Sequence, residues 1–366
     1  MNVGIICFWD RTATPYLEKY ERILQEKNID YEVIFWNRTG IKSSQLKHRE
    51  REVVQECSTK TWRKIIDFIM WRNNVLKVLK KEQYDFLIVL STYPAVLLVN
   101  YLLKYYQQKY LFDIRDYSME SFSLFGKVVN NLIDKSAFTT VSSKGYLRWL
   151  NPSNKIVPNH NITYYQNDYE KTIRLVNSKK LNFTFVGNVR LDKQTEAVLL
   201  KLKSSRKYIS GFVGRILPGC NIIDICREND IKNVYFQGQF SSNDKPEIYR
   251  NIDLINAVYA NEDKNIRLAD ATPLPNRVYD AAVFKCPIVA SKGTYLAELI
   301  DEYYLGFSVN GFDDNIEDQF DTFMGNFNEK AFREGCDKFL ADVLKEEKNF
   351  LKKLSDTLDE LSEGAM

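Results

Sequence analysis

The amino-acid sequence predicts an α/β protein built from two doubly wound, Rossmann-like domains in tandem. Short apolar runs of strand length alternate with segments of helical apolar spacing, which is typical of parallel sheets covered by helices. The alternation stops in a polar stretch at 167–180 and then restarts. The chain has 366 residues, which is enough to bury two domain-sized cores. We therefore expect one domain at 1–172, a second at 173–340 and a C-terminal helix at 341–366.

The N-terminal half contains short runs rich in β-branched and aromatic residues. These candidate strands lie at 3–8, 31–36, 86–90, 109–114, 138–141 and 155–158. A helix is expected at 14–27. The apolar stretch at 84–103 has the length of a membrane span, but polar residues and Pro94 interrupt it. We interpret it as a buried strand, a Ser-Thr turn and a helix with Pro94 in its first turn.

The strand pattern restarts at 182–187 in the C-terminal half. Further candidate strands lie at 208–213, 233–236, 253–259 and 286–290. Helical spacing is found at 195–202 and 278–285, and another helix is expected to begin near Tyr295. From 311 onward the chain is acidic and helical in pattern.

Composition narrows the class of protein. The net charge of +3 is small for this length and does not predict a nucleic-acid partner. The six cysteines are scattered without a CxxC pair, so we expect reduced thiols. Only His48 and His160 are present, which excludes a multi-histidine metal site. Met1 leads directly into the first candidate strand without the pattern of a signal peptide, and we expect a cytoplasmic protein.

The stretch 271–310 carries the most specific pattern in the chain. It reads as a proline-rich loop, a helix, a short buried strand, a glycine turn and a second helix. In doubly wound units, such strand ends and helix N-termini commonly hold a nucleotide phosphate. The stretch resembles the donor-binding segment of GT-B glycosyltransferases, specifically the glycosyltransferase family 4 (group 1) enzymes. The residues that carry the resemblance are Asp280, Pro287, Ile288, Val289, Gly293 and Glu298.

The resemblance implies a GT-B fold, in which two Rossmann-like domains face a central cleft. The N-terminal domain would bind the acceptor, the C-terminal domain would bind a nucleotide-sugar donor, and the C-terminal helix would pack back toward the N-terminal domain. No two aspartates have the Asp-x-Asp spacing of metal-dependent GT-A transferases. We therefore expect no metal site and no cofactor besides the donor substrate, with protein groups neutralising the diphosphate.

A glycine turn follows the candidate strand at 182–187 and precedes a helix. Gly187 would let the backbone approach a ligand, and the helix N-terminus would favour a diphosphate. The resemblance implies that Arg190 and Lys193 neutralise the leaving diphosphate, which makes them catalytic and donor-binding residues. The alternative is a solvated turn with two surface cations.

Asp280 lies where the family usually has the second glutamate of a Glu-x7-Glu pair, so the resemblance implies that it accepts hydrogen bonds from the ribose hydroxyls. Thr272 stands in place of the first glutamate, which in the family faces the donor sugar. Either Thr272 or a neighbour in the 271–276 loop binds the sugar instead, or the donor differs. Asn276 and Arg277 resemble the Pro-Asn-Lys variant of polysaccharide-assembly members. Arg277 either contacts phosphate or caps the local surface.

Two further loops follow candidate strands of the C-terminal half. The resemblance implies that Gly214 and Arg215 border the phosphates, and that Gly238 allows close backbone contact with a uracil-like base. A UDP-sugar is therefore the expected donor. The alternative is that both glycines serve ordinary turns.

In the N-terminal half, Asp10 and Arg11 follow the first candidate strand in a loop without a Gly-x-Gly-x-x-Gly motif, which disfavours a dinucleotide site. We expect Asp10 and Arg11 to bind the acceptor. Arg115 and Asp116 end another strand where relatives place an acidic or His-Asp pair near the acceptor, and the resemblance implies an acceptor-binding Arg115 and a catalytic Asp116. The alternative is a structural ion pair between Arg115 and Asp116.

The segment 61–81 has helical spacing, two tryptophans and an excess of lysine and arginine. This composition suits either an anionic membrane surface or a core-packed helix with a cationic outer face. Lipid-linked acceptors are common in the resembling group, so peripheral contact with the inner face of the membrane is one of our two interpretations.

The resemblance implies a retaining glycosyltransferase that transfers a sugar from a nucleotide-diphosphate sugar to a glycan or lipid-linked acceptor in bacterial surface polysaccharide assembly, such as capsule. Two alternatives stay open. One is a GT-B-fold epimerase of nucleotide sugars, and the other is a non-catalytic binding subunit, which Thr272 would permit.

Overall fold

The computed structural model describes residues 1–43, 46, 48–58, 60–119, 122–162, 173, 175, 179–259 and 267–363. The chain divides into two compact units. Unit 1 comprises Met1–His160 and Lys345–Met366, and unit 2 comprises Asn161–Leu344. Most of the polar stretch at 167–180, with the expected boundary after residue 172, lies outside the described residues.

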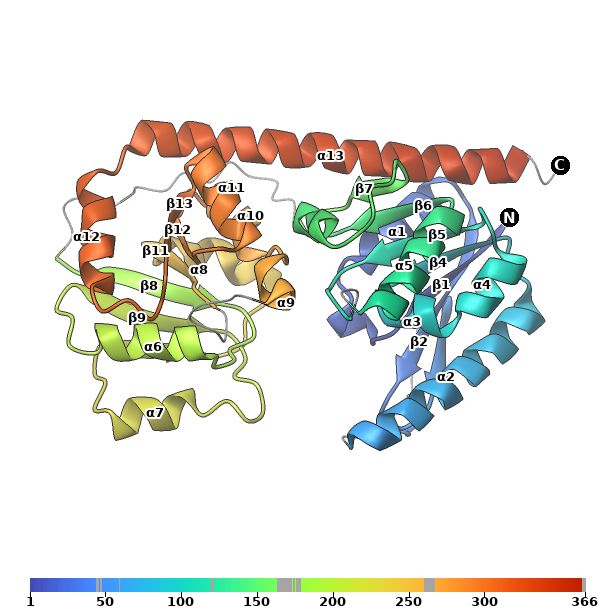
Figure 1. Cartoon of the computed structure of the whole chain (residues 1–366), viewed down its shortest axis with the longest axis horizontal. Coiled ribbons are helices and arrows are strands. Elements are labelled where there is room, and N and C mark those ends of the chain that lie inside the picture. The colour runs from blue at the N-terminus through green and yellow to red at the C-terminus, as the bar shows by residue number, and fades with distance from the viewer. Residues whose placement is uncertain are drawn as a thin grey trace. The chain divides into compact units, whose positions relative to one another are not determined.

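Unit 1 is built on a parallel sheet that has, within the described residues, seven strands in the order β3-β2-β1-β4-β5-β6-β7 (Figure 1). The strands are β1 (Asn2–Cys7), β2 (Asp30–Asn37), β3 (Glu50–Val54), β4 (Phe86–Leu90), β5 (Tyr110–Ile114), β6 (Phe138–Val141) and β7 (Ile156–Pro158). In the centre of the sheet, Ile5 pairs with Val33 on one side and Ile88 on the other. This strand order is that of a doubly wound sheet, in which the chain reverses direction between β1 and β4.

Helices cover both faces of the unit 1 sheet (Figure 1). They are α1 (Leu17–Glu26), α2 (Thr61–Glu82), α3 (Thr92–Leu97), α4 (Val99–Tyr105) and α5 (Ser123–Lys135), with 3₁₀ turns η1 (Arg11–Ala13) and η2 (Lys144–Arg148). Because side chains alternate along a strand, Ile6 and Phe8 pack toward α2 to α5, whereas Ile5 and Cys7 pack toward α1. The second face also receives the C-terminal part of α13 (Glu329–Glu363), including the fully buried Phe350.

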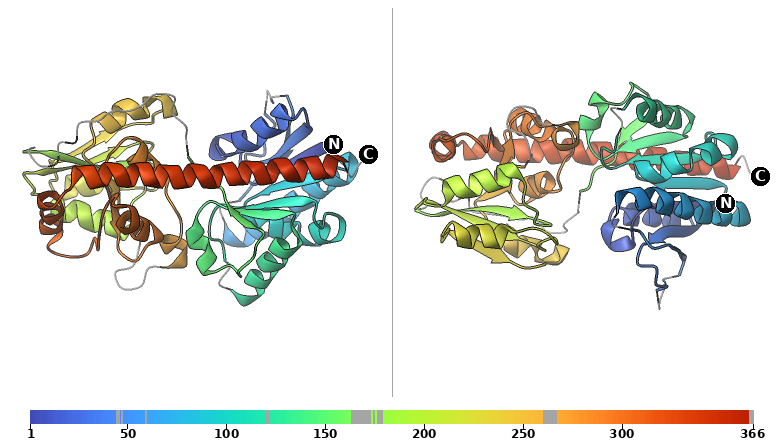
Figure 2. Two further views of the ribbon diagram at one scale, coloured as in Figure 1. Left: turned by 90° about the horizontal axis from the view of Figure 1, so that it is seen from above. Right: turned by 60° about the horizontal axis from the view of Figure 1, so that its bottom comes forward.

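Unit 2 repeats the architecture with a parallel sheet in the order β10-β9-β8-β11-β12-β13. Its strands are β8 (Leu181–Val186), β9 (Tyr208–Val213), β10 (Val234–Gln237), β11 (Leu254–Ala257), β12 (Ile288–Ser291) and β13 (Gly306–Val309). Its helices are α6 (Lys193–Leu202), α7 (Ile222–Glu228), η3 (Ser242–Asp244), α8 (Lys245–Arg250), α9 (Leu268–Ala271), α10 (Arg277–Val283), α11 (Tyr295–Tyr303) and α12 (Ile316–Gly325). The helices α6, α7 and α12 pack on one face, and α8, α10, α11 and the start of α13 pack on the other. Figure 2 shows α13 as one unbroken helix.

The two doubly wound α/β units confirm the predicted fold class, and each predicted strand is present with bounds shifted by at most two residues. The strands β3 and β13 were not predicted. β3 reads Glu-Arg-Glu-Val-Val and lies at the edge of its sheet, where its charged side chains form ion pairs. A charged edge strand lacks the apolar run on which strand prediction depends.

The stretch 84–103 forms β4, α3 and the start of α4, which confirms the strand-turn-helix interpretation. Pro94 lies in the first turn of α3. Among the described residues, every helix is too short or too polar to cross a bilayer.

Candidate functional site

The candidate donor site lies at the carboxyl edge of the unit 2 sheet. β8 and β11 are neighbours in that sheet, yet β8 is followed by β9 on one side and β11 by β12 on the other, so the strand order reverses between them. In doubly wound sheets, ligands bind outside the carboxyl ends of the strands at such a reversal. The residues after β8, which begin with Gly187, therefore stand where a ligand is expected.

Gly187 and Gly214 follow the adjacent strands β8 and β9 and pack on each other. Their φ angles are +140° and +136°, which residues with a side chain rarely adopt. A Cβ atom on Gly214 would lie 1.9 Å from the carbonyl oxygen of Gly187. The Gly187 N–H donates to the Val213 carbonyl over 2.9 Å. The two glycines, both predicted to bind the donor, thus form a tight backbone surface at the reversal point.

The N-terminus of α6 lies directly beyond this turn. The Asp192 carboxylate caps the helix by accepting hydrogen bonds from the Thr195 N–H and hydroxyl, both over 2.9 Å. The predicted cations Arg190 and Lys193 flank the cap, and both side chains are exposed. The positive end of the helix and the two cations make this turn favourable for an anion.

Arg277, the first residue of α10, packs against the end of β8. Its guanidinium lies 4.0 Å from the ring centroid of Phe185, and Nη1 donates to the Val186 carbonyl over 3.2 Å. Nη1 would lie 3.7 Å from a Cβ atom on Gly187. Nε is buried and has no hydrogen-bond partner among the described residues. Burial lowers the pKa of Arg277, because desolvation disfavours the charged form. A desolvated cation therefore lies beside the Gly187 turn.

The Asp280 carboxylate is buried and accepts hydrogen bonds from two side chains of α8. Lys245 Nζ lies 2.9 Å from Oδ1 and 3.0 Å from Oδ2, and the Tyr249 hydroxyl donates to Oδ2 over 2.8 Å. Burial raises the pKa of Asp280, and the ion pair with Lys245 opposes that rise. Lys245 and Tyr249 were not among the predicted residues, because no local pattern links them to a carboxylate on another helix.

The remaining predicted donor residues differ in exposure. Thr272 is fully buried at the end of α9, and its hydroxyl donates to the Leu268 carbonyl over 2.7 Å. Asn276 precedes α10 and is exposed. Arg215 and Gly238 are exposed beyond the ends of β9 and β10.

In unit 1, the predicted acceptor residues Asp10 and Arg11 lie after β1. The Asp10 side chain is exposed, and its Oδ1 accepts a hydrogen bond from the Ala13 N–H over 3.2 Å. The Arg11 guanidinium forms two hydrogen bonds to Glu21, over 2.7 and 2.8 Å, and one to Glu50 over 2.6 Å. The structure therefore places Arg11 in an ion-pair network that joins α1 to β3.

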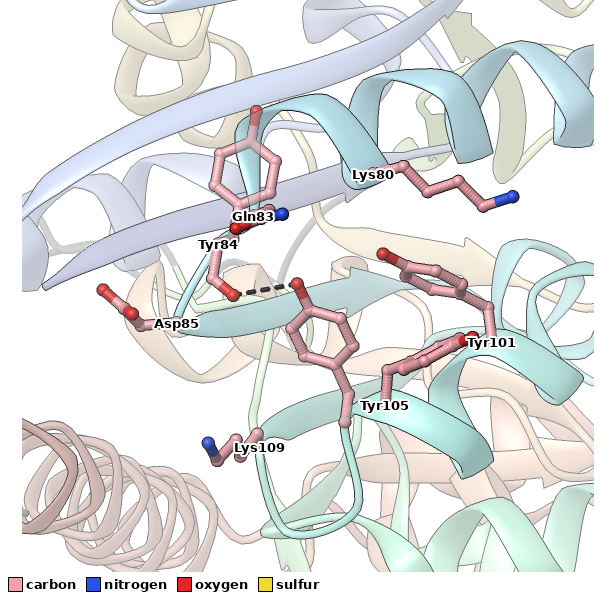
Figure 3. Close-up of a pocket in the computed structure, with 8 residues that line it drawn as sticks. Lys80, Gln83, Tyr84, Asp85, Tyr101, Tyr105 and Lys109 are labelled. Carbon is pink, nitrogen blue, oxygen red and sulfur yellow. Dashed lines mark hydrogen bonds between the residues drawn. The ribbon is translucent and has the colours of Figure 1, made fainter. Parts of the chain in front are cut away.

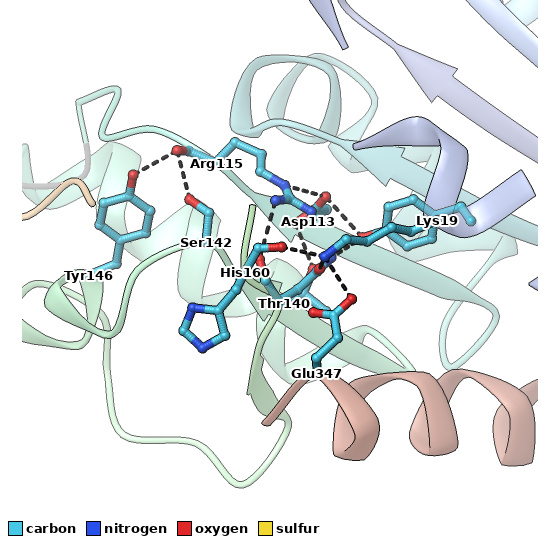
Figure 4. Close-up of polar contacts among 10 residues, drawn as sticks. Lys19, Asp113, Arg115, Thr140, Ser142, Tyr146, His160 and Glu347 are labelled. Atoms are coloured by element: carbon cyan, nitrogen blue, oxygen red, sulfur yellow. Dashed lines mark hydrogen bonds and ion pairs between the residues drawn. The ribbon is translucent and has the colours of Figure 1, made fainter. Parts of the chain in front are cut away.

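Arg115 lies in a buried polar network, which Figure 4 shows. Its Nε donates to Asp113 over 2.7 Å, and its Nη1 donates to the Asn159 carbonyl over 3.2 Å. Although burial alone would lower the pKa of Arg115, the Asp113 carboxylate raises it above its usual value. The buried partner of Arg115 is thus Asp113, and the predicted catalytic Asp116 is exposed.

The same network reaches α13 within unit 1. Lys19 lies 2.6 Å from the buried Glu347 and also donates to the His160 carbonyl. His160 Nε2 lies 2.7 Å from Glu346. The contacts of Lys19 and His160 attach the C-terminal part of α13 to the ends of the unit 1 strands.

The first half of α2 carries an exposed apolar stripe, which we call the α2 apolar face. Its large side chains have exposed fractions between 43% and 63%, and they are Trp62, Ile65, Ile66, Ile69 and Met70. Lys60, Arg63 and Lys64 are exposed beside them. In the second half of the helix, Trp71 and Leu79 are buried in the core.

No protein-family model matches the sequence, and no curated protein matches it by sequence. The chain superposes on sucrose-phosphate synthase from Thermosynechococcus elongatus with a TM-score of 0.71 over 100% of both chains, at 12% identity. HepE from Anabaena, solved with UDP and glucose, gives a TM-score of 0.68 at 14% identity, covering 97% of this chain and 99% of that chain. The lipopolysaccharide outer core galactosyltransferase WaaB gives 0.62 at 12% identity, covering 98% and 99%. The fold is GT-B.

The predicted donor residues Gly187, Arg190, Lys193, Gly214 and Arg277 all belong to unit 2, in the turns after β8 and β9 or at the first residues of α6 and α10. Among the described residues, no three His, Cys, Asp or Glu side chains gather in a group that could hold a metal ion.

A hollow of about 440 Å³ lies in unit 1, near the amino-terminal ends of β4 and β5 (Figure 3). Four tyrosines and several charged or polar residues line it: Tyr84, Tyr101, Tyr105, Tyr106, Lys80, Gln83, Asp85 and Lys109. None of the predicted site residues contributes to this hollow.

The turn after β4 contains two features that the sequence reasoning missed. Ser91 has φ +84° and ψ 156°, a region of backbone space used almost only by glycine. The hydroxyl of Thr92 is buried and has no hydrogen-bond partner among the described residues. Both residues lie at the reversal point between β1 and β4, where unit 1 is expected to bind a ligand.

Proposed function

We propose that the protein is a retaining glycosyltransferase that moves a sugar from a nucleotide-diphosphate sugar, specifically a UDP-sugar, to a saccharide or lipid-linked acceptor. The observation that carries the proposal is the cationic glycine turn at the reversal point of the unit 2 sheet in a GT-B fold. Support for UDP as the nucleotide comes from HepE, a structure of the same fold solved with UDP and glucose.

In this proposal the diphosphate lies against the Gly187 backbone. Arg190, Lys193 and Arg277 supply positive charge, and the N-terminus of α6 adds its dipole. Charge on the diphosphate grows as the bond to the sugar breaks, so cations held in place stabilise the transition state. The desolvated Arg277 interacts more strongly with that charge than a fully hydrated cation would.

The other predicted donor residues complete the nucleotide site. Arg215 borders the phosphates, and the backbone of Gly238 contacts the base. The Asp280 carboxylate is proposed to accept hydrogen bonds from the ribose hydroxyls. To do so, it must give up the hydrogen bond that it accepts from Tyr249 or from Lys245. Thr272 and Asn276 are the residues proposed to contact the donor sugar; Asn276 is exposed, whereas Thr272 is buried.

The acceptor hydroxyl attacks the face of the anomeric carbon from which the diphosphate departs, so the configuration is retained. Asp10 and Asp116 are the exposed acidic side chains proposed for the acceptor site, and Arg115 stays a candidate through its position after β5. The α2 apolar face and its cations suit an anionic bilayer, where a lipid-linked acceptor would be presented. We therefore propose a peripheral protein of the inner membrane face that acts in surface polysaccharide assembly.

The test is a thermal-shift panel with UDP, GDP, ADP, CMP and TDP in the absence of added metal. Ligand binding to the folded state raises the melting temperature by mass action. We expect UDP to stabilise the parent protein selectively, and Arg190→Ala and Arg277→Ala to lose most of that shift. The matched control is Arg227→Ala, an exposed arginine on α7 paired with Asp224, which should keep the full shift.

An absence of any nucleotide shift in the parent would overturn the donor-site proposal and favour a non-catalytic binding subunit. Selective UDP binding followed by turnover of a UDP-sugar without any acceptor would instead favour an epimerase or hydrolase. Acceptor-dependent release of UDP is the result that the transferase proposal requires.

A further inference from the structure

Arg38 occupies an unusual position at the carboxyl edge of the unit 1 sheet. It directly follows β2 and lies beside the residues that follow β1. Its Nη2 donates to the Phe8 carbonyl over 2.9 Å, which holds the guanidinium at the ends of these two strands. The site is on unit 1 and is separate from the cationic turn of unit 2.

Aromatic rings surround the Arg38 guanidinium. Its central carbon lies 3.6 Å from the ring centroid of Trp9, 4.4 Å from that of Trp36 and 4.6 Å from that of Phe8. Phe8 and Trp36 are buried, whereas Trp9 is 45% exposed. The rings fix the plane of the guanidinium and remove much of its hydration, so its remaining donors are held ready for an anion.

The charge of Arg38 is only partly offset, because the Asp10 carboxylate acts on it without forming an ion pair that the described residues show. Nε is buried without a hydrogen-bond partner, and no ion pair to Arg38 is present among the described residues. Arg11, Arg51 and Arg115 differ from Arg38, because each has a carboxylate oxygen within 2.8 Å. Burial lowers the pKa of Arg38, and the nearby Cys57 and Asp10 oppose this shift only in part.

The helix α2 starts close to this cation, because the Cys57 N–H donates to the Arg38 carbonyl over 3.2 Å and α2 begins four residues later. Phe68 of α2 lies 5.3 Å from Phe8 and 5.6 Å from Trp36, measured between ring centroids. Ile65 lies three residues before Phe68 and is therefore its neighbour on the helix, and Ile69 follows Ile65 by four residues; both isoleucines are exposed. A guanidinium whose charge is only partly offset thus lies near the start of a helix that carries exposed apolar side chains, an arrangement that an anionic amphiphile would fit.

We propose that Arg38 binds the phosphate group of a lipid-phosphate acceptor whose hydrocarbon chain lies along the α2 apolar face. The forked N–H donors of a guanidinium match phosphate oxygens, and enclosure by rings strengthens the interaction. This inference rests on the proposed transferase function, because it specifies the class of acceptor.

The experiment measures binding of decyl phosphate, below the concentration at which it forms micelles, by tryptophan fluorescence and calorimetry. Decyl glucoside serves as the neutral amphiphile and inorganic diphosphate as the headgroup alone. The variants are Arg38→Gln, which removes the charge at similar volume, and Arg38→Lys, which keeps the charge without the fork. The matched control is Arg49→Gln, since Arg49 also lies over a ring, that of Tyr31, but has Asp30 as its carboxylate partner.

We expect Arg38→Gln to weaken decyl phosphate binding by about tenfold to a hundredfold, the effect of losing a charge-assisted hydrogen bond. Arg38→Lys should weaken it less, and Arg49→Gln should bind as the parent does. Equal binding by the parent and Arg38→Gln would overturn the inference. So would parent binding of decyl glucoside or inorganic diphosphate as tight as that of decyl phosphate.

The UDP thermal shift, measured on the same variants, separates this inference from the proposed function. A normal UDP shift with Arg38-independent decyl phosphate binding would refute the acceptor inference alone. Arg38-dependent decyl phosphate binding without a UDP shift would leave the anion site standing and refute the transferase. A UDP shift retained by Arg38→Gln also shows that the variant is folded.

Discussion

Replacing Lys245 by methionine should destabilise unit 2, because it would leave a buried carboxylate without its cation. The side chains of Lys245 and Asp280 are 13% and 7% exposed, and both carboxylate oxygens lie within 3.0 Å of the ammonium group. Methionine keeps the length and the apolar part of the lysine side chain. The change therefore removes mainly the charge and its hydrogen bonds.

Removing one partner of a buried ion pair costs about 3–5 kcal/mol of unfolding free energy. Tyr249 still donates to the carboxylate, and Lys245 retains some exposure, so we expect a loss near the lower limit, about 3 kcal/mol at pH 7.5. Replacing both charges, in Lys245→Met with Asp280→Asn, should recover most of that loss. The matched control is Lys232→Met, whose ion pair with Asp230 is exposed and should contribute less than about 1 kcal/mol.

The loss should also shrink as the pH falls. Burial raises the pKa of Asp280 in the folded protein, and loss of Lys245 removes the group that opposes this rise. A carboxyl group with a raised pKa binds protons more readily in the folded state than in the unfolded state, so its contribution to stability falls as the pH rises. The unfolding free energy of Lys245→Met should therefore come closer to that of the parent as the pH falls from 7.5 to acidic values.

Urea denaturation followed by circular dichroism at several pH values measures both effects. A loss below about 1 kcal/mol at pH 7.5 would contradict the reasoning, since it would mean that Asp280 does not depend on Lys245. A loss that stays constant as the pH falls would contradict the assignment of the effect to the ionised carboxylate.

Two further predictions test the turn and the apolar face. Gly214→Ala should destabilise the protein by more than about 2 kcal/mol, because φ at Gly214 is +136° and the new Cβ atom would lie 1.9 Å from the Gly187 carbonyl oxygen. The control is Gly238→Ala, where a Cβ atom meets open space, and it should have the melting temperature of the parent. Equal melting temperatures for all three proteins would refute the steric argument. Ile65→Glu should weaken binding to anionic vesicles in a flotation assay by roughly tenfold, since it removes an apolar side chain that is 62% exposed and adds a negative charge. The control Ile223→Glu, on α7, should bind as the parent does. Vesicle binding by Ile65→Glu equal to that of the parent would exclude this face from membrane contact.

Much of the fold could be predicted because it depends on local patterns. Alternation of apolar strands and amphipathic helices locates β1, β4 and β8 to within a residue or two, and side-chain periodicity is a property of neighbouring residues. The glycines of the turns at 187 and 214 could be singled out for the same reason, since a glycine after a strand marks a backbone turn. The edge strand β3 was missed because its charged residues are stabilised by partners elsewhere in the chain.

The chemistry around individual side chains could not be predicted in this way. The sequence identifies Arg115 and Asp116 as neighbours, but Arg115 pairs with Asp113, which is buried and also accepts a hydrogen bond from Thr140 of β6. Likewise, Asp280 was recognisable as an acidic residue on a helix, but its partners Lys245 and Tyr249 come from α8.

The sequence by itself determined the α/β class, the division into two α/β units and the glycine turn with its cations, because each depends on residues close together in the chain. Only the tertiary structure decided which charges are balanced. Arg277 reaches Phe185, and Arg38 reaches Phe8 and Trp9, through the order of strands in each sheet. Strand order brings together residues that are far apart in the chain, and no local pattern records it.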